Sequence, residues 1–349
     1  MNKYAMNQGK INKPYDCIIN WRVNQICNFK CVYCDSSRNS INQYNRYSDR
    51  FEYFFKNTDK TYLICMTGGE PFLYPRYVEL CEKLTSKHYL GVFTNLSSNK
   101  AYDFTERIDP ERVEFIYCSV HIEEREQRRE VEDFINKISL LKRKGFNVVT
   151  PIVMYPSVLK RFNELYRFFD NHGIILMPKI FFGYYRGKHY PQGYTRKERN
   201  KILLYSKLSE SEMQRAKTYY GPITLNVQQM HGFYSWKGLP CKAGKDIIKL
   251  ESDGTFTRCV TDKERLGSVT TGELRLHKKP KICNAERCSC PSHGLQFAIG
   301  KPKLLLEKGV VREFMLYRLI KSYVKPIVNK SPAAKQIFRN IKKITVDKS

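Results

Sequence analysis

The sequence predicts an α/β fold in which six β/α units build one mostly parallel sheet. Apolar, β-branched or aromatic runs alternate with segments of helical periodicity through the first half of the 349 residues. Strands separated by helices pair in parallel through right-handed crossovers. Polar motifs follow the first two expected strands, at the strand ends where parallel barrels carry their chemistry. These observations predict a partial barrel followed by a smaller domain.

The expected elements alternate along the chain. The strands are expected at residues 17–23, 62–66, 90–94, 114–120, 147–154 and 174–182. The helices are expected at roughly residues 47–55, 76–86, 102–108, 126–144 and 157–171. After the last strand, residues 182–195 are aromatic and turn-rich. That segment either covers the barrel mouth or links two domains.

Three cysteines after the first strand have the spacing C-x3-C-x2-C, as Cys27, Cys31 and Cys34. With 12 Cys in the chain, chance predicts roughly 0.014 occurrences of this spacing. Iron-sulfur clusters normally take four cysteines, so three thiolates leave one iron of a [4Fe-4S] cluster open. Tyr33 precedes the last cysteine, and Thr67-Gly68-Gly69-Glu70-Pro71 follows the second strand.

With these two motifs the chain resembles the radical S-adenosylmethionine (SAM) enzymes. The resemblance implies a [4Fe-4S] cluster on Cys27, Cys31 and Cys34, whose open iron binds the amine and carboxylate of SAM. It implies reductive cleavage of SAM to a 5'-deoxyadenosyl radical that abstracts hydrogen from a substrate. The family's partial (β/α)6 radical SAM barrel is expected over residues 15–205, after an extension of residues 1–14. A structural zinc site is the alternative for the three cysteines.

The resemblance also implies where SAM binds. Gly68, Gly69 and Glu70 match the residues that bind the methionyl ammonium, for which a carboxylate and backbone carbonyls are suitable partners. Glycine permits a close backbone approach because it has no Cβ. The residues expected to bind the cofactor are Tyr33, Gly68, Gly69, Glu70, Pro71, Asn95, Ser119 and Lys179.

Of the last three residues, Asn95 and Ser119 lie at the ends of expected strands and Lys179 lies within the sixth. Asn95 and Ser119 could bond to the ribose or carboxylate of SAM, and Lys179 could neutralise that carboxylate. For each one the alternative is a polar side chain that satisfies local backbone groups. His121, beside Ser119, is expected to be structural rather than catalytic.

A second cysteine system lies at Cys241, Cys259, Cys283, Cys288 and Cys290. Residues 247–250 and 255–258 predict a β-hairpin that brings Cys241 and Cys259 together. The C-x12-G-x4-C segment resembles the start of SPASM and Twitch domains, which implies an auxiliary iron-sulfur cluster. The full SPASM pattern has seven cysteines, so five predict a reduced SPASM/Twitch-like domain with one auxiliary [4Fe-4S] cluster. Which cysteine is spare stays open, and zinc is the alternative metal.

The remaining chain divides into three expected parts. Residues 206–235 are expected to form a helical connector, residues 236–300 the SPASM/Twitch-like β-hairpin and helix domain, and residues 301–349 a basic amphipathic helical tail. Residues 307–349 hold 11 Lys+Arg against 3 Asp+Glu, which is +8 of the chain's +27. Such a helix suits the inner surface of an anionic membrane, and a helix packed on the barrel is the alternative.

The sequence thus predicts a radical SAM enzyme. A cytoplasmic location is expected, because neither a signal-type start nor a membrane-spanning apolar stretch is present. The expected reaction is an oxidation of a small-molecule, carbohydrate or lipid-linked substrate, with a reducing partner such as flavodoxin or ferredoxin. Maturation of a ribosomal peptide is the second hypothesis. A non-enzymatic iron-sulfur or zinc protein that binds nucleic acid is the hypothesis from a different class, although no RNA-binding signature supports nucleic acid as a partner.

Overall fold

The computed structural model describes residues 15–34, 48–215, 230, 232–286, 288, 297–300 and 303–306. The chain divides into two compact units, one of residues 1–230 with 234–303 and one of residues 231–233 with 304–349. The first unit contains the barrel and the cysteine-rich segment. The expected extension, residues 1–14, and most of the expected tail, residues 307–349, lie outside the described residues. The boundaries expected between domains stay predictions.

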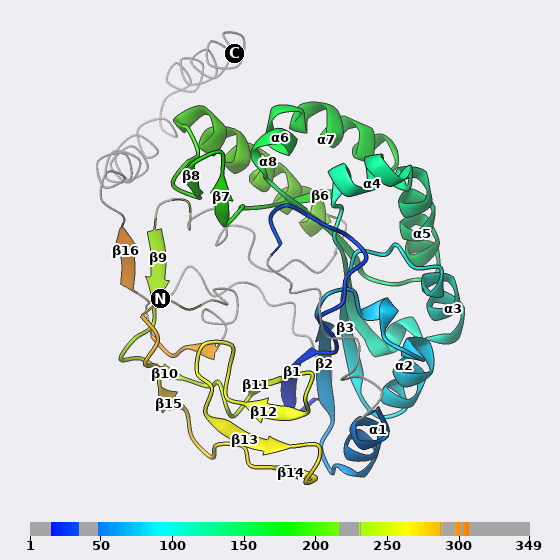
Figure 1. Cartoon of the computed structure of the whole chain (residues 1–349), viewed down its shortest axis with the longest axis vertical. Coiled ribbons are helices and arrows are strands. Elements are labelled where there is room, and N and C mark those ends of the chain that lie inside the picture. Colours follow the sequence, from blue (N-terminus) through cyan, green and yellow to red (C-terminus); the bar gives the residue numbers. More distant parts are fainter. Residues whose placement is uncertain are drawn as a thin grey trace. The chain divides into compact units, whose positions relative to one another are not determined.

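A ten-stranded sheet is the frame of the first unit, with the order β14-β13-β12-β11-β1-β2-β3-β4-β5-β6 (Figure 1). Its parallel strands in chain order are β1 (Cys17–Arg22), β2 (Tyr62–Thr67), β3 (Tyr89–Thr94), β4 (Val113–Cys118), β5 (Val148–Val153) and β6 (Leu176–Lys179). Each pairs in parallel with the next. The predicted α/β fold with six strands in sequential parallel order is therefore confirmed.

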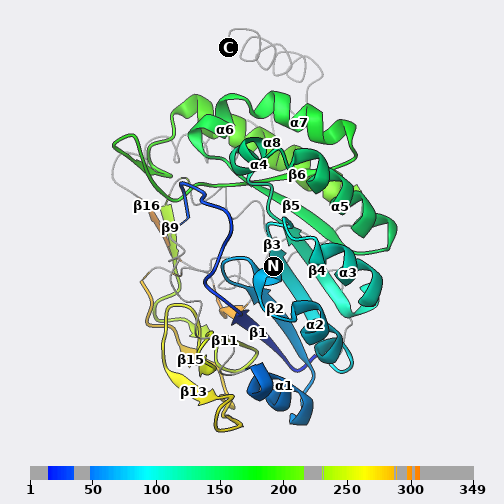
Figure 2. The ribbon, with the colours of Figure 1, turned by 45° about the vertical axis from the view of Figure 1, so that its right-hand side comes forward.

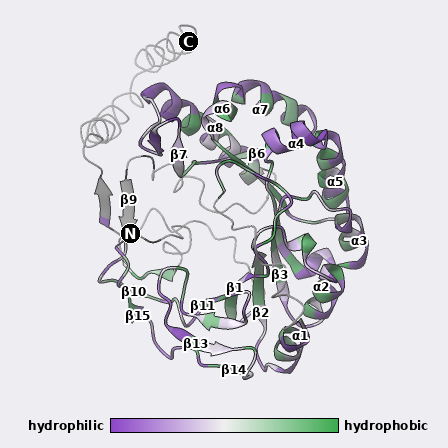
Figure 3. Ribbon diagram, viewed as in Figure 1, coloured by the Kyte–Doolittle hydropathy of each residue, from purple (hydrophilic) through white to green (hydrophobic). Residues whose placement is uncertain are grey.

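Helices follow the strands and cover one face of the sheet (Figures 1 and 2). They are α1 (Ser48–Asn57), α2 (Tyr77–Thr85), α3 (Lys100–Arg107), α4 (Ile122–Arg128), α5 (Val131–Arg143), α6 (Pro156–Lys160), α7 (Phe162–Asn171) and α8 (Arg196–Arg215), with the short 3-10 helices η2 (Pro71–Leu73) and η3 (Pro110–Arg112). Polar residues gather on their outer sides and hydrophobic residues face the strands (Figure 3). No helix among the described residues is long and apolar enough to span a bilayer.

The structure corrects several expected elements. Residues 126–144 are not one helix. α4 ends at Arg128, the next residue Arg129 has a φ of 60° in the left-handed region, and α5 begins after Glu130. The segment expected at 157–171 is likewise divided into α6 and α7 at Arg161. No glycine or proline marks either break, so local sequence carried no signal for them.

The turn-rich segment after β6 contains a hairpin of β7 (Gly183–Tyr185) and β8 (Lys188–Tyr190). Positive φ values at Arg186 and Gly187 suit its two-residue turn. Helix α8 then runs through the expected boundary at residue 205. The connector expected to be helical ends instead in the strand β9 (Gly232–Ser235), which pairs with β16 (Lys303–Leu306).

The cysteine-rich segment extends the barrel sheet rather than forming a separate layer. β11 (Ile247–Leu250) pairs in parallel with β1, from Ile18 opposite Ile247 to Trp21 opposite Leu250. It pairs on its other side with β12 (Thr255–Thr257), which confirms the predicted hairpin. β13 (Arg265–Ser268) and β14 (Glu273–Leu274) continue the antiparallel part, and β10 (Pro240–Cys241) pairs with β15 (Lys281–Ile282).

Candidate active site

The loop that carries the first three cysteines packs directly on the Gly68 to Glu70 motif. The Glu70 backbone N–H donates to the Ile26 carbonyl at 2.7 Å, and the Asn24 side-chain amide donates to the Glu70 carbonyl at 2.7 Å. A Cβ on Gly69 would lie 2.0 Å from the Ile26 carbonyl oxygen, and one on Gly68 would lie 2.2 Å from that of Asn24. The two glycines therefore permit the close approach of the cysteine loop to the end of β2.

The Glu70 carboxylate is 0% exposed and is bonded to the protein itself. Its Oε1 accepts hydrogen bonds from the Thr94 hydroxyl at 2.6 Å and the Phe72 backbone N–H at 3.1 Å. Its Oε2 accepts from the Asn95 backbone N–H at 2.6 Å. Burial raises the pKa of this carboxyl to about 7, although the three donors oppose that shift. Glu70 thus joins the ends of β2 and β3, while buried Pro71 begins η2.

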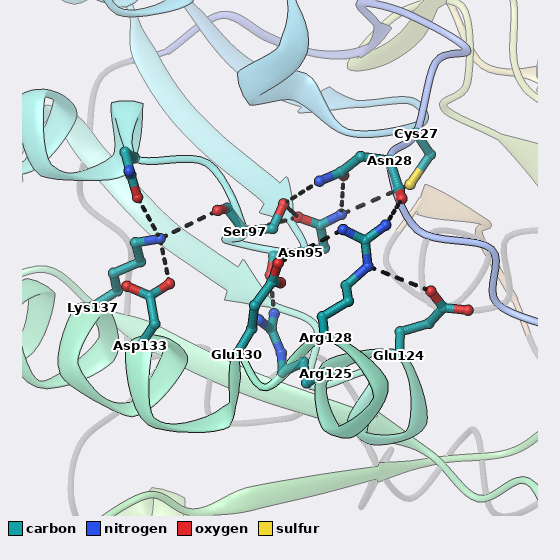
Figure 4. A network of polar contacts seen from close by, with 11 residues as sticks. Cys27, Asn28, Asn95, Ser97, Glu124, Arg125, Arg128, Glu130, Asp133 and Lys137 are labelled. Atoms are coloured by element: carbon teal, nitrogen blue, oxygen red, sulfur yellow. Dashed lines mark hydrogen bonds and ion pairs between the residues drawn. The ribbon is translucent and has the colours of Figure 1, made fainter.

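A polar network holds Cys27 and its neighbour Asn28 (Figure 4). The Asn95 side-chain amide donates to the Asn28 side-chain oxygen at 3.0 Å and lies 3.8 Å from the Cys27 sulfur. Asn28 in turn donates to the Ser97 hydroxyl at 2.8 Å, and Arg128 donates to the Asn28 carbonyl. Asn95 therefore positions the cysteine loop, and its expected bond to SAM stays a prediction.

A buried arginine that the sequence did not indicate joins two strand ends. The guanidinium of Arg125 is 0% exposed and donates to the carbonyls of Val120, at 2.7 Å, and Asn95. Its Cζ lies 3.8 Å from the centre of the Phe134 ring, and Ser119 accepts a longer bond of 3.4 Å through its carbonyl. Burial lowers the pKa of Arg125 to about 10, so the side chain stays charged at neutral pH. An arginine near a helix start has no local signature of burial.

His121 lies against the cysteine loop rather than away from it. Its Nδ1 is 3.3 Å from the Cys31 sulfur and 2.9 Å from the Tyr33 hydroxyl oxygen. Burial lowers the pKa of His121 to about 3, with the charges of Arg125 and Lys179 acting in the same direction, so the ring is neutral. Burial raises the pKa of the Cys31 thiol to about 12. Lys179, at the end of β6, thus acts electrostatically on the same site.

The three cysteines of the first loop have the donor chemistry that an iron-sulfur cluster takes. Burial chiefly raises the pKa of Cys31, and Cys27 and Cys34 are near enough to add to that increase. Within the described ranges, no three His, Cys, Asp or Glu side chains converge on the position of a single metal ion. Cysteine thiolates are the ligands of iron-sulfur clusters, so the chemistry of this donor set fits a cluster.

A cavity of about 430 Å³ lies beside this loop. Cys31 and Tyr33 line it together with Tyr155 and Tyr185, which come from the α6 start and the β7–β8 hairpin. Tyr155 and Tyr185 are in edge contact, with ring centroids 4.6 Å apart. The hairpin therefore forms part of the wall of this cavity.

Three cysteines of the second system lie near enough to affect one another electrostatically. Burial chiefly raises the pKa of Cys241, and Cys283 and Cys259 are near enough to add to the increase. The Asp262 backbone N–H donates to the Cys259 sulfur at 3.1 Å, a bond that suits a thiolate. Cys288 is half-buried, whereas Cys290 lies outside the described residues.

Arg258 joins the segments that carry these cysteines. Its side chain is 3% exposed and donates to the carbonyls of Ala243, at 3.2 Å, and Lys281, at 3.0 Å. It also donates to the Asp262 carboxylate at 2.6 Å. Because β11 runs parallel to β1, the start of β11 and Cys241 lie toward the opposite end of β1 from Cys27. The paired residues between them span roughly 10 Å at about 3.3 Å per residue.

Comparison with known proteins agrees with this geometry. Residues 21–169 match the Radical SAM superfamily. Among solved structures, native anSMEcpe with bound AdoMet and Kp18Cys peptide is 14% identical with a TM-score of 0.51, over 91% of this chain and 100% of that chain. SuiB from Streptococcus suis is 12% identical with a TM-score of 0.44, over 71% of this chain. No curated protein matches the chain.

At these identities the structural likeness concerns the fold alone, and the chain covers 61% of the length of SuiB. The family match covers the last residues of β1, all of β2 to β5, both sequence motifs and the loop that carries Cys27, Cys31 and Cys34. Residues 21–169 are therefore similar to a radical SAM domain.

Proposed function

We propose that this protein is an enzyme that binds a [4Fe-4S] cluster and SAM at the ends of β1 to β3. The observation that carries the proposal is the close packing of the cysteine loop on Gly68 and Gly69. In this arrangement a three-thiolate loop lies directly against the motif that the family uses for SAM. When bound, the cluster and SAM would supply an electron and a 5'-deoxyadenosyl radical, which abstracts hydrogen from a substrate.

The chain's own residues would hold and shield that chemistry. Cys27, Cys31 and Cys34 would be the cluster ligands, and the Asn95 amide fixes the loop between them. Phe29 is 4% exposed and packs edge-on against His121, which would limit access of water beside Cys31. The Glu70 carboxylate already accepts three hydrogen bonds from the protein, so a ligand ammonium would bond to backbone carbonyls of the motif in its place.

A second cluster would lie on Cys241, Cys259 and Cys283, with Cys288 or Cys290 as the fourth ligand. The fit is supported by the effect of Cys283 and Cys259 on the pKa of Cys241 and by the N–H···S bond at Cys259. Hydrogen abstraction leaves a substrate radical, and an oxidation must remove one further electron from it. A cluster toward the other end of β1 could accept that electron, which favours an oxidation. The substrate that we propose for it is a small-molecule, carbohydrate or lipid-linked compound.

Cofactor cleavage tests the main proposal. Anaerobically reconstituted protein with SAM and either dithionite or a flavodoxin system should release 5'-deoxyadenosine and methionine. The variant with Ala at all three positions Cys27, Cys31 and Cys34 is the matched control. If the wild type has a reduced cluster but releases no more deoxyadenosine than this variant, the proposal is wrong.

The auxiliary cluster is tested separately. Cys241→Ala should leave deoxyadenosine formation largely intact while it abolishes the oxidised product, because the electron acceptor is removed. Full product formation in a variant that lacks its second cluster would reject electron acceptance. A bound zinc ion in place of that cluster would support the metal-site alternative.

Maturation of a ribosomal peptide is the second candidate function. It is supported by one structure of the same fold, anSMEcpe, which is described with a bound peptide. Mass spectrometry of candidate peptides and sugars after turnover distinguishes the two substrate classes. The nucleic-acid-binding alternative predicts no SAM cleavage, and the membrane role of the tail predicts loss of anionic-vesicle binding when residues 307–349 are deleted.

A further inference from the structure

We propose that His121 is a positioning residue that donates its Nδ1 hydrogen to the iron-bound thiolate of Cys31 and thereby raises the reduction potential of the cluster. The inference rests on the proposed function in one respect, because it takes Cys31 as a cluster ligand. It concerns the strength of the cluster as a reductant. It would hold for any substrate.

The backbone and the neighbouring rings fix the imidazole in place. His121 has a φ of 43°, in the left-handed region that non-glycine residues adopt uncommonly and in which His, Asn and Asp are enriched. Its ring is stacked on Tyr33, with a centroid separation of 6.0 Å and an interplanar angle of 17°. Phe29 packs edge-on at 5.8 Å and 85°. The ring is thus held between two aromatic side chains of the cysteine loop.

The orientation directs Nδ1 toward the sulfur. Nδ1 lies 3.3 Å from the Cys31 sulfur and 2.9 Å from the Tyr33 oxygen, so both groups share one edge of the ring. A thiolate bound to iron has no hydrogen and can only accept. A lone pair on Nδ1 would face the sulfur lone pairs, whereas an N–H there makes a hydrogen bond. The Tyr33 hydroxyl also hydrogen-bonds to the Cys31 side chain, so its hydrogen points to the sulfur and its oxygen is left to accept from Nδ1. The cluster-bound site therefore favours the tautomer with hydrogen on Nδ1.

A donor to a ligand sulfur acts on the redox equilibrium of the cluster. Reduction adds negative charge that is shared by the ligand sulfurs, so a hydrogen bond to Cys31 stabilises the reduced state more than the oxidised state. His121 therefore makes the cluster easier to reduce. A physiological one-electron donor can then load the cluster at a less negative potential.

The experiment is a redox titration monitored by electron paramagnetic resonance, on full-length reconstituted protein without SAM. The signal that SAM addition perturbs identifies the cluster on the Cys31 loop. His121→Ala should shift its midpoint to a more negative potential. His121→Asn should stay near the wild type, because the Asn amide can place a donor near the position of Nδ1 and Asn tolerates a positive φ.

A second measurement gives its main result on the wild type alone. With [15N]histidine in the wild type, pulsed resonance of the reduced cluster should show a weak nitrogen coupling. The coupling should persist in Tyr33→Phe, because that change removes the hydroxyl and leaves the histidine donor. It should disappear in His121→Asn.

Two results would overturn the inference. One is an equal midpoint in His121→Ala and the wild type at equal iron content. The other, which decides the matter if the Ala variant binds no iron, is the absence of a histidine coupling in the wild type. Neither measurement requires turnover. A protein with the coupling but no SAM cleavage would contradict the proposed function while supporting the contact.

Discussion

Gly69→Ala should remove the first cluster while it leaves the fold largely intact. Gly69 does not have a positive φ, so alanine meets no backbone restriction at this position. The added Cβ would lie 2.0 Å from the Ile26 oxygen, where ordinary contact begins at 3.4 Å. The cysteine loop must therefore move by about 1.4 Å, the difference between these two distances. Both partners of this contact are backbone, so no side-chain rotation can relieve it.

The movement has a cost that can be estimated from the contacts it breaks. The Glu70 N–H loses its 2.7 Å bond to the Ile26 carbonyl, which leaves a buried donor and costs about 1–3 kcal/mol. Overpacking adds about 1–3 kcal/mol. Displacement of adjacent Cys27 disturbs the ligand geometry. We expect about four irons fewer per chain.

Iron and sulfide analysis of anaerobically reconstituted protein measures this loss, and far-UV circular dichroism checks the fold. Gly173→Ala is the matched control, because Gly173 has a φ of 65° but no atom within 4 Å of the position that an added Cβ would take. That variant should lose about 1–2 kcal/mol of stability from backbone strain and keep its iron. A Gly69→Ala protein with full iron content would refute the steric reasoning.

Three further predictions concern the metal centres and Glu70. Wild-type protein should hold about eight irons, and replacement of all three cysteines of the first loop should remove about half, whereas a tightly held zinc would contradict the auxiliary cluster. Burial raises the folded-state pKa of Glu70 from 4.5 to about 7. The protonated carboxyl therefore contributes fully to the free energy of unfolding below pH 4.5, and about 3 kcal/mol of that free energy is lost as the pH rises to about 7. In urea unfolding, the free energy of unfolding of Glu70→Gln should not fall over this pH range. An equal dependence of that free energy on pH in both proteins would show that Glu70 does not have a raised pKa. Arg258→Ala should lose only the auxiliary irons because three loop segments lose their common donor, while the exposed control Arg265→Ala should keep them.

Local patterns were sufficient to predict much of this protein from its sequence. The alternation of strands and helices identified the parallel sheet, because the hydrophobic periodicity that marks each element depends only on residues close together in the sequence. The hairpin of β11 and β12 was visible from its turn at Gly254, which has a φ of 85°. The spacing of Cys27, Cys31 and Cys34 indicated a cluster for the same reason, since a short stretch of covalent chain limits how far apart the thiolates can lie.

Long-range contacts were decided only by the tertiary structure. Parallel pairing of β11 with β1 joins residues more than two hundred positions apart, and the sequence of neither segment indicates which strand it pairs with. The contact partners of Gly69 were decided in the same way, since the sequence indicates that a close approach occurs but not which atoms approach. Arg125 and His121 occupy ordinary positions in the sequence. They act at the site because the ends of β3 and β4 converge on the cysteine loop, where buried carbonyl and sulfur atoms require donors.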